Sequence, residues 1–139
     1  MKQRSPIIII EDDLDDQQIL KETFTELGTN RELIFFDDCD KAFAFLMSAT
    51  IKPFLIISDI NMPGTDGISF KTKIDETDHL RMKSIPFIFL STSGAENFID
   101  VAYRKTNLQG YFQKGSSVAD VKKQLECILM YWEEALQPK

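Results

Sequence analysis

The sequence contains few cysteines and no long apolar run, and each shortage excludes a class of protein. Its two cysteines, Cys39 and Cys127, have no short metal-ligand spacing, so we expect neither a disulfide scaffold nor a zinc module but ordinary thiols in a reducing compartment. No run approaches the ~18 apolar residues of a membrane-spanning helix. The opening MKQRSP leads into four isoleucines, too short a stretch for a signal peptide. We therefore expect a cytoplasmic protein that has no membrane partner.

Positive charge is also scarce. Lysine and arginine number 16 against 22 aspartates and glutamates, which gives a formal net charge of -6. Binding to a nucleic acid depends on neutralising its phosphates with basic side chains, so we expect no nucleic-acid partner. The 139 residues suit one domain, which we predict to span residues 1–139 with a core at about 5–135. We therefore expect no attached output domain.

Short apolar runs alternate with stretches of helical period. Five runs, rich in β-branched and aromatic residues, predict strands buried on both faces of a parallel sheet: 7–10, 33–36, 54–57, 87–90 and the weaker 110–112. Apolar residues at helical spacing predict five helices between and after them, around 20–27, 42–49, 70–74, 95–102 and 118–132. The order predicts an α/β fold, a doubly wound (βα)5 sheet of five parallel strands with helices on both faces.

Four of the predicted strands run into polar residues capable of chemistry. The first is followed by Glu11 and Asp12, the third by Asp59, the fourth by Ser91, and the fifth by Lys114. Ligands of open parallel sheets bind at the carboxyl ends of the strands, so we expect these side chains to meet at one edge. Clustered carboxylates favour a hard cation such as Mg2+. Aspartate can act as a nucleophile that takes a phosphoryl group, whose charge a lysine and a hydroxyl would stabilise.

Four sequence blocks resemble the CheY-like receiver domains of response regulators in two-component signalling. They are IIIIEDD at 7–13, LIISDINMPGTDG at 55–67, IPFIFLSTSG at 85–94 and GYFQKG at 110–115. The second is the most specific, since receivers carry Asp-x-x-Met-Pro-x-x-x-Gly after the third strand. The resemblance implies a flavodoxin/CheY-like fold with strand order 2-1-3-4-5. It also implies a bacterial phosphorelay protein that accepts a phosphoryl group from a sensor histidine kinase and thereby switches a protein-binding surface, rather than an enzyme.

The resemblance also implies a role for each site residue. Asp59 would be the phosphoacceptor. Asp12 and Asp59, with the backbone carbonyl of Asn61, would bind Mg2+ or Mn2+ directly, and Glu11 would act on the metal through water. No further cofactor is implied.

On the phosphoryl side, Lys114 would pair with the phosphoryl oxygens and Ser91 would follow the phosphoryl group. Tyr111 matches the switch aromatic, whose ring turns inward on activation. Two positions depart from the family. Gly115 stands where receivers usually have proline, often after a cis peptide, so the peptide geometry at Lys114–Gly115 is open. Thr92 stands where many receivers have alanine.

Two other functions for the same fold fit the residues less well. Phosphatases of the haloacid-dehalogenase group carry a second acid two residues after the nucleophile, where this chain has Asn61. A flavodoxin-like carrier needs a phosphate-binding loop after the first strand, where Glu11 and Asp12 would repel the phosphate. The single histidine, His79, lies in a polar stretch and predicts an exposed loop residue, and the acids at 37–40 predict a helix start rather than a second metal site.

The output must then be association with other proteins. The resemblance places the partner surface on the fourth helix, fifth strand and fifth helix of the receiver, with a homodimer as an alternative occupant. The segment 75–84 resembles receivers that partner bacteriophytochrome-type kinases, which makes such a kinase the candidate donor.

Overall fold

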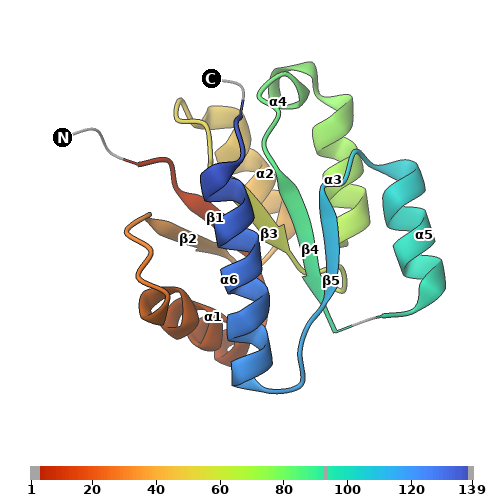
Figure 1. Ribbon diagram of the computed structural model, residues 1–139. Coiled ribbons are helices and arrows are strands. Elements are labelled where there is room, and N and C mark those ends of the chain that lie inside the picture. The colour runs from red at the N-terminus through yellow and green to blue at the C-terminus, as the bar shows by residue number, and fades with distance from the viewer. Residues whose placement is uncertain (1–3, 93, 138–139) are drawn as a thin grey trace.

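The five apolar runs form one parallel sheet in the order β2-β1-β3-β4-β5 (Figure 1). This computed structural model describes residues 4–92 and 94–137. The strands are β1 (Ile7–Ile10), β2 (Leu33–Phe36), β3 (Leu55–Ser58), β4 (Phe87–Ser91) and β5 (Gly110–Gln113). The predicted fold class and strand order are therefore confirmed.

The inner strands are apolar apart from the serines that end β3 and β4, because both of their faces are covered. Every residue of β1, β3 and β4 is buried, whereas the edge strands β2 and β5 are mostly half-buried. In register, Ile10 of β1 lies beside Phe36 on one side and Ser58 on the other. This register brings the carboxyl ends of the strands to one edge.

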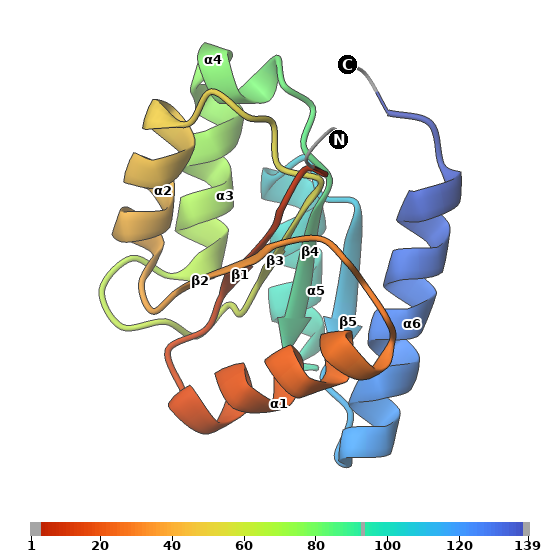
Figure 2. The same ribbon diagram turned by 90° about the vertical axis from the view of Figure 1, so that its left-hand side faces the viewer.

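Helices cover both faces of the sheet. They are α1 (Leu14–Glu26), α2 (Cys39–Ser48), α3 (Gly67–Glu76), α4 (Asp78–Arg81), α5 (Glu96–Lys105) and α6 (Val118–Glu134). Figure 2 shows α2 and α3 on one side of the sheet and α6 on the other. Among these described helices, none is both long and apolar enough to cross a membrane.

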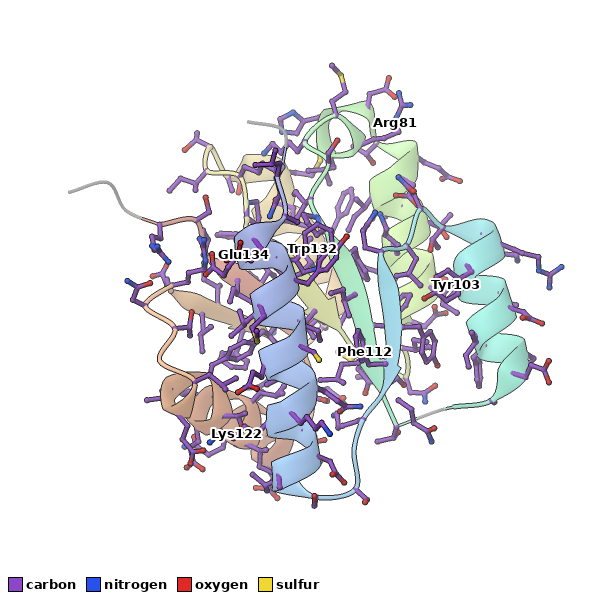
Figure 3. The ribbon with its side chains drawn as sticks, in the orientation of Figure 1. Arg81, Tyr103, Phe112, Lys122, Trp132 and Glu134 are labelled. Atoms are coloured by element: carbon purple, nitrogen blue, oxygen red, sulfur yellow. The ribbon has the colours of Figure 1, made fainter. Side chains whose placement is uncertain are left out.

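The core accordingly has two halves, one on each face of the sheet. The half under α2, α3 and α5 contains Phe70, Phe87 and Phe89. The other half is closed by α1 and α6, and there Phe112 of β5 and Trp132 of α6 pack at its margin (Figure 3). Burial of aromatic and aliphatic side chains on this scale is the main stabilising contribution to the fold.

Side-chain caps fix where four of the helices begin. Asp13, Asp38, Asp66 and Ser117 each accept a hydrogen bond from the backbone amide three residues ahead, at the starts of α1, α2, α3 and α6. The acids at 37–40 thus start α2 as predicted, and Lys41 pairs with two of them.

Two sequence expectations were wrong in detail. The polar stretch around His79 is not a loop there but the one-turn helix α4, anchored by the buried Leu80; His79 itself is exposed as expected. A single apolar residue shows no period, so the sequence could not indicate this turn. Val118 opens the apolar range 118–132 that predicts the last helix, yet it is 57% exposed because it follows the capping residue, before α6 reaches the core.

The two ends of the described chain lie together at the edge of the sheet where the strands begin (Figure 1). Arg4 lies 3.7 Å from the carboxylate of Glu133, near the end of α6, and Arg31 binds the same carboxylate at 2.7 Å. Arg31 also stacks on Phe54, 3.6 Å from the ring centroid. These contacts fasten α6 at the edge farthest from the strand ends that carry the polar residues.

Candidate functional site

The polar residues predicted from the strand ends meet at the carboxyl edge of the sheet. Backbone hydrogen bonds extend the ladders past the strands and place each of them. The amide of Asp59 donates to Ile10 at 3.1 Å, and that of Glu11 donates to Phe36 at 3.0 Å. The amide of Lys114 donates to the carbonyl of Ser91 at 2.7 Å. Residues far apart in the sequence are thereby held in one pocket.

Three carboxylates lie close together at this edge. One oxygen each from Glu11, Asp12 and Asp59 lies within 4.8 Å of the other two. Glu11 is buried, Asp59 is half-buried and Asp12 is exposed. Negative charges this close repel one another, and a hard divalent cation bound by their oxygens relieves that repulsion. The donor set fits Mg2+ or Mn2+, which prefer oxygen ligands.

The chain after β3 holds Asp59 in place. Its Oδ1 accepts a hydrogen bond from the amide of Ile60 at 2.7 Å, and its carbonyl accepts one from the hydroxyl of Ser58 at 2.8 Å. Asn61, two residues later, is exposed. The half-buried carboxylate is therefore oriented and still reachable from solvent.

Lys114 spans the pocket from the β5 side. Its ammonium donates to Glu11 at 2.9 Å and to Asp16 at 3.3 Å. Burial alone would lower the pKa of Lys114, but the hydrogen bond to Glu11 and the charges of Glu11, Asp16 and Asp59 raise it. Burial raises the pKa of Glu11, and the bond from Lys114 offsets part of that rise. Lys114 is therefore a fixed positive charge beside the carboxylates.

Asp16 is a site residue that the sequence reasoning missed. The cap at Asp13, which accepts from the amide of Asp16 at 3.0 Å, sets the first turn of α1. That turn presents the Asp16 carboxylate to Lys114. The sequence contains one indication of this contact. The helix α1 starts directly after the acids that follow β1, so its first turn has to lie at the same edge of the sheet.

The remaining predicted residues line the β4–β5 side. Ser91 is fully buried at the end of β4 and pairs in register with Gln113. Tyr111 is half-buried, with its ring 6.0 Å from that of Phe89. Thr92, directly after Ser91, is exposed. The structure thus brings Glu11, Asp12, Asp59, Ser91 and Lys114 to one edge, with Tyr111 packed beside it.

Two glycines near the site, Gly67 and Gly115, lie where a Cβ atom would not fit. Gly67 begins α3 and donates to the carbonyl of Ile60 at 2.9 Å, so close that an added Cβ would overlap the carbonyl of Asp59. Gly115 follows Lys114, and an added Cβ there would overlap Asp120. The peptide geometry left open at Lys114–Gly115 is trans, since the described residues contain no cis peptide bond.

Gly67→Ala is expected to displace the segment that carries Asp59. The new methyl group would meet backbone atoms of Asp59 and Ile60, which cannot rotate away as a side chain could. We expect a loss of about 1–3 kcal/mol in the free energy of unfolding, measured by urea denaturation, and weaker Mg2+ binding by calorimetry. Gly110→Ala is the control, because its nearest neighbour is a ring carbon of Phe112 at 3.4 Å. Equal losses in both variants would contradict the close approach.

Comparison of this chain with known proteins finds a matching family and several similar proteins. A model of the response regulator receiver domain family matches residues 7–126. Response regulator Rcp1 of Synechocystis sp. is 28% identical over 135 residues, which cover 94% of this chain and 90% of that protein. The solved structure of the phosphorylated cyanobacterial phytochrome response regulator RcpA is similar with a TM-score of 0.88 at 25% identity, covering 98% of this chain and 99% of its own. The Mn2+-bound form of Rcp1 gives a TM-score of 0.86 at 27% identity over 98% of this chain and 100% of its own.

Proposed function

This chain belongs to the response regulator receiver family, and we propose that Asp59 is its phosphoacceptor, in a site that binds Mg2+ or Mn2+ through Glu11, Asp12 and Asp59. The observation that carries the proposal is the cluster of three carboxylates at the strand ends, with the ammonium of Lys114 bound to one of them, Glu11. The family works generally as a switch rather than as an enzyme, and the output proposed here is a change of binding surface.

The chemistry follows from the charges in the pocket. A carboxylate oxygen of Asp59 forms a bond to phosphorus while the bond from phosphorus to the donor's histidine nitrogen breaks, and the bonding electron pair returns to the imidazole. The cation supplies charge neutralisation of the phosphoryl oxygens when bound. Asp59 is kept in place by Ile60 and Ser58, so it needs little reorganisation to attack. Lys114, whose ammonium is already held beside the cluster by Glu11, offers that charge to the phosphoryl oxygens.

The same two residues connect phosphorylation to the surface. Ser91 and Lys114 are joined by the backbone hydrogen bond between β4 and β5, so contacts that either makes to the phosphoryl group pull on both strand ends. Tyr111 lies three residues before Lys114 and packs on Phe89. We propose that this movement opens space for the Tyr111 ring and so changes what a partner binds. A ligand shifts such an equilibrium only through differential contacts, which Ser91 and Lys114 provide.

The surface proposed to change lies along α5, β5 and α6, the elements that correspond to the fourth helix, fifth strand and fifth helix of the receiver pattern. Figure 1 shows β5 running between the two helices. Tyr103 of α5 is 50% exposed (Figure 3), and Tyr131 of α6, which lines a hollow together with Phe112 of β5, is 63% exposed. Large exposed apolar side chains of this kind favour a protein partner.

We further propose a phytochrome-type histidine kinase as the donor. The likeness to RcpA, a phytochrome response regulator, supports this choice, together with the segment 75–84 noted in the sequence.

Incubation with acetyl phosphate and Mg2+ is expected to add one acid-labile phosphoryl group to each chain. Mass spectrometry of the intact protein measures the gain, and a phosphorylated phytochrome-type kinase replaces acetyl phosphate in a second arm. EDTA is expected to prevent labelling in both arms, because the carboxylates cannot approach a phosphoryl group without a cation. Labelling that persists in EDTA would contradict the metal site, and labelling by acetyl phosphate but not by the kinase would contradict the proposed donor alone.

A further inference from the structure

We propose that Gln124 of α6 is a positioning residue that sets the place of Lys114, an inference that rests on the function proposed for Lys114. The side-chain amide of Gln124 bonds to both chain neighbours of Lys114. Its Nε2 donates to the carbonyl of Gln113 at 2.6 Å, and its Oε1 accepts from the amide of Gly115 at 3.0 Å. The two bonds bracket Lys114 from a helix that begins after it in the chain.

The two hydrogen bonds from Gln124 add to the contact that already holds the backbone of Lys114. The amide of Lys114 is already bonded to Ser91, which fixes it to β4. With Gln113 and Gly115 also held, the backbone on both sides of Lys114 is constrained. The side chain therefore starts from a fixed point and reaches Glu11 and Asp16 across the pocket.

Gly115 explains why such a bracket is needed at this position. Glycine leaves the backbone freer than any other residue, so on its own it would let the segment after β5 move. Its amide supplies the donor that Gln124 accepts, which a proline cannot do. Its missing Cβ leaves the room that Asp120 occupies. Gly115 and Gln124 therefore act as a pair, because the Gln124 side chain holds in place the backbone that the glycine alone would leave free to move.

Gln124→Met tests the inference, because methionine keeps the length of the side chain and removes both hydrogen bonds. Beryllofluoride with Mg2+ mimics the phosphoryl group, and we expect its affinity to fall roughly tenfold, as small displacements of a catalytic group commonly cost this much or more. Affinity for Mg2+ alone should stay unchanged, since Gln124 contacts none of the three carboxylates. Without any ligand, the amide of Gly115 should exchange with solvent faster, and the ammonium of Lys114 should show greater mobility by NMR relaxation.

Gln18→Met is the matched control. Gln18 is exposed on α1 and bonds to Glu22 within the same helix, so its replacement should leave all four measurements unchanged. In a Lys114→Ala background, Gln124→Met should cause no further loss of beryllofluoride affinity, because a residue that acts through Lys114 has nothing left to position.

An additive loss in the double variant, or an unchanged mobility of Lys114 in Gln124→Met, would overturn the inference. The failure of the proposed function would look different. A wild-type protein that binds no beryllofluoride, while Gln124→Met still loosens Lys114, would remove the phosphoryl-binding role and leave the positioning role standing.

Discussion

Replacing Asp59 with asparagine is expected to abolish phosphoryl labelling by both acetyl phosphate and a kinase. Asparagine has nearly the same shape, and its carbonyl oxygen can still accept the hydrogen bond that Ile60 gives to Oδ1. What it lacks is the negative charge, so it is a poor nucleophile for phosphorus and a weaker ligand for the cation. We expect labelling to fall below one part in a hundred of wild type while the free energy of unfolding changes by less than ~1 kcal/mol. Intact-mass spectrometry and urea denaturation measure the two quantities.

Asp15→Asn is the control for this variant. Asp15 is an exposed acid in the first turn of α1, at the same end of the molecule, so its replacement removes one charge without touching the carboxylate cluster. It should label like wild type. Stoichiometric labelling of Asp59→Asn would show that the phosphoryl group goes elsewhere, and it would remove Asp59 from the proposal.

Lys114→Ala is expected to uncouple phosphorylation from the change of surface. The variant keeps Glu11, Asp12 and Asp59, so it should bind Mg2+ at least as well as wild type, because a positive charge next to the cation site is gone. Labelling should persist at a reduced rate. NMR shifts on addition of beryllofluoride should be large in wild-type protein at Ser91 and at 110–115, and small in the variant, because one of the two contacts that move β4 and β5 is missing.

Removal of Lys114 also leaves the buried carboxylate of Glu11 without its charged partner. We expect a loss of about 1–3 kcal/mol in the free energy of unfolding. Lys122→Ala is the control: its ammonium (labelled in Figure 3) binds the exposed Glu26 of α1 at 3.1 Å, and exposed pairs contribute little. Equal beryllofluoride shifts in Lys114→Ala and wild-type protein would contradict the route from the pocket to Tyr111.

The meeting of the polar residues could be predicted from the sequence for a physical reason, whereas the strand order was implied only by the resemblance to CheY-like receivers. In a parallel sheet every strand ends at the same edge, so a residue that follows a strand has its place fixed by the fold alone. Glu11, Asp12, Asp59, Ser91 and Lys114 all stand at or directly after a strand, and all five lie at that edge. For these residues, the place in the sequence is enough to predict the place in the fold.

The contacts of Asp16 and Gln124 could not be predicted in this way. Both residues lie on helices, where the direction of a side chain depends on how the helix is rotated and where it begins. Asp16 faces Lys114 because Asp13 caps α1 three residues earlier, and Gln124 meets the end of β5 because α6 packs against the sheet through Val121 and Leu125. Contacts from two helices to Lys114 and its chain neighbours result from packing, which a pattern of apolar residues indicates only coarsely.

The pairing of Arg4 with Glu133 has a practical consequence for measuring partners. Because both ends of the described chain lie at the edge where the strands begin, a linker on either end leaves from the side opposite the phosphoacceptor pocket (Figure 1). A protein tethered to a sensor chip through such a linker would present the pocket and the first turn of α1 to the solution. Binding of a large kinase could then be followed on the chip without the attachment point competing for the same surface.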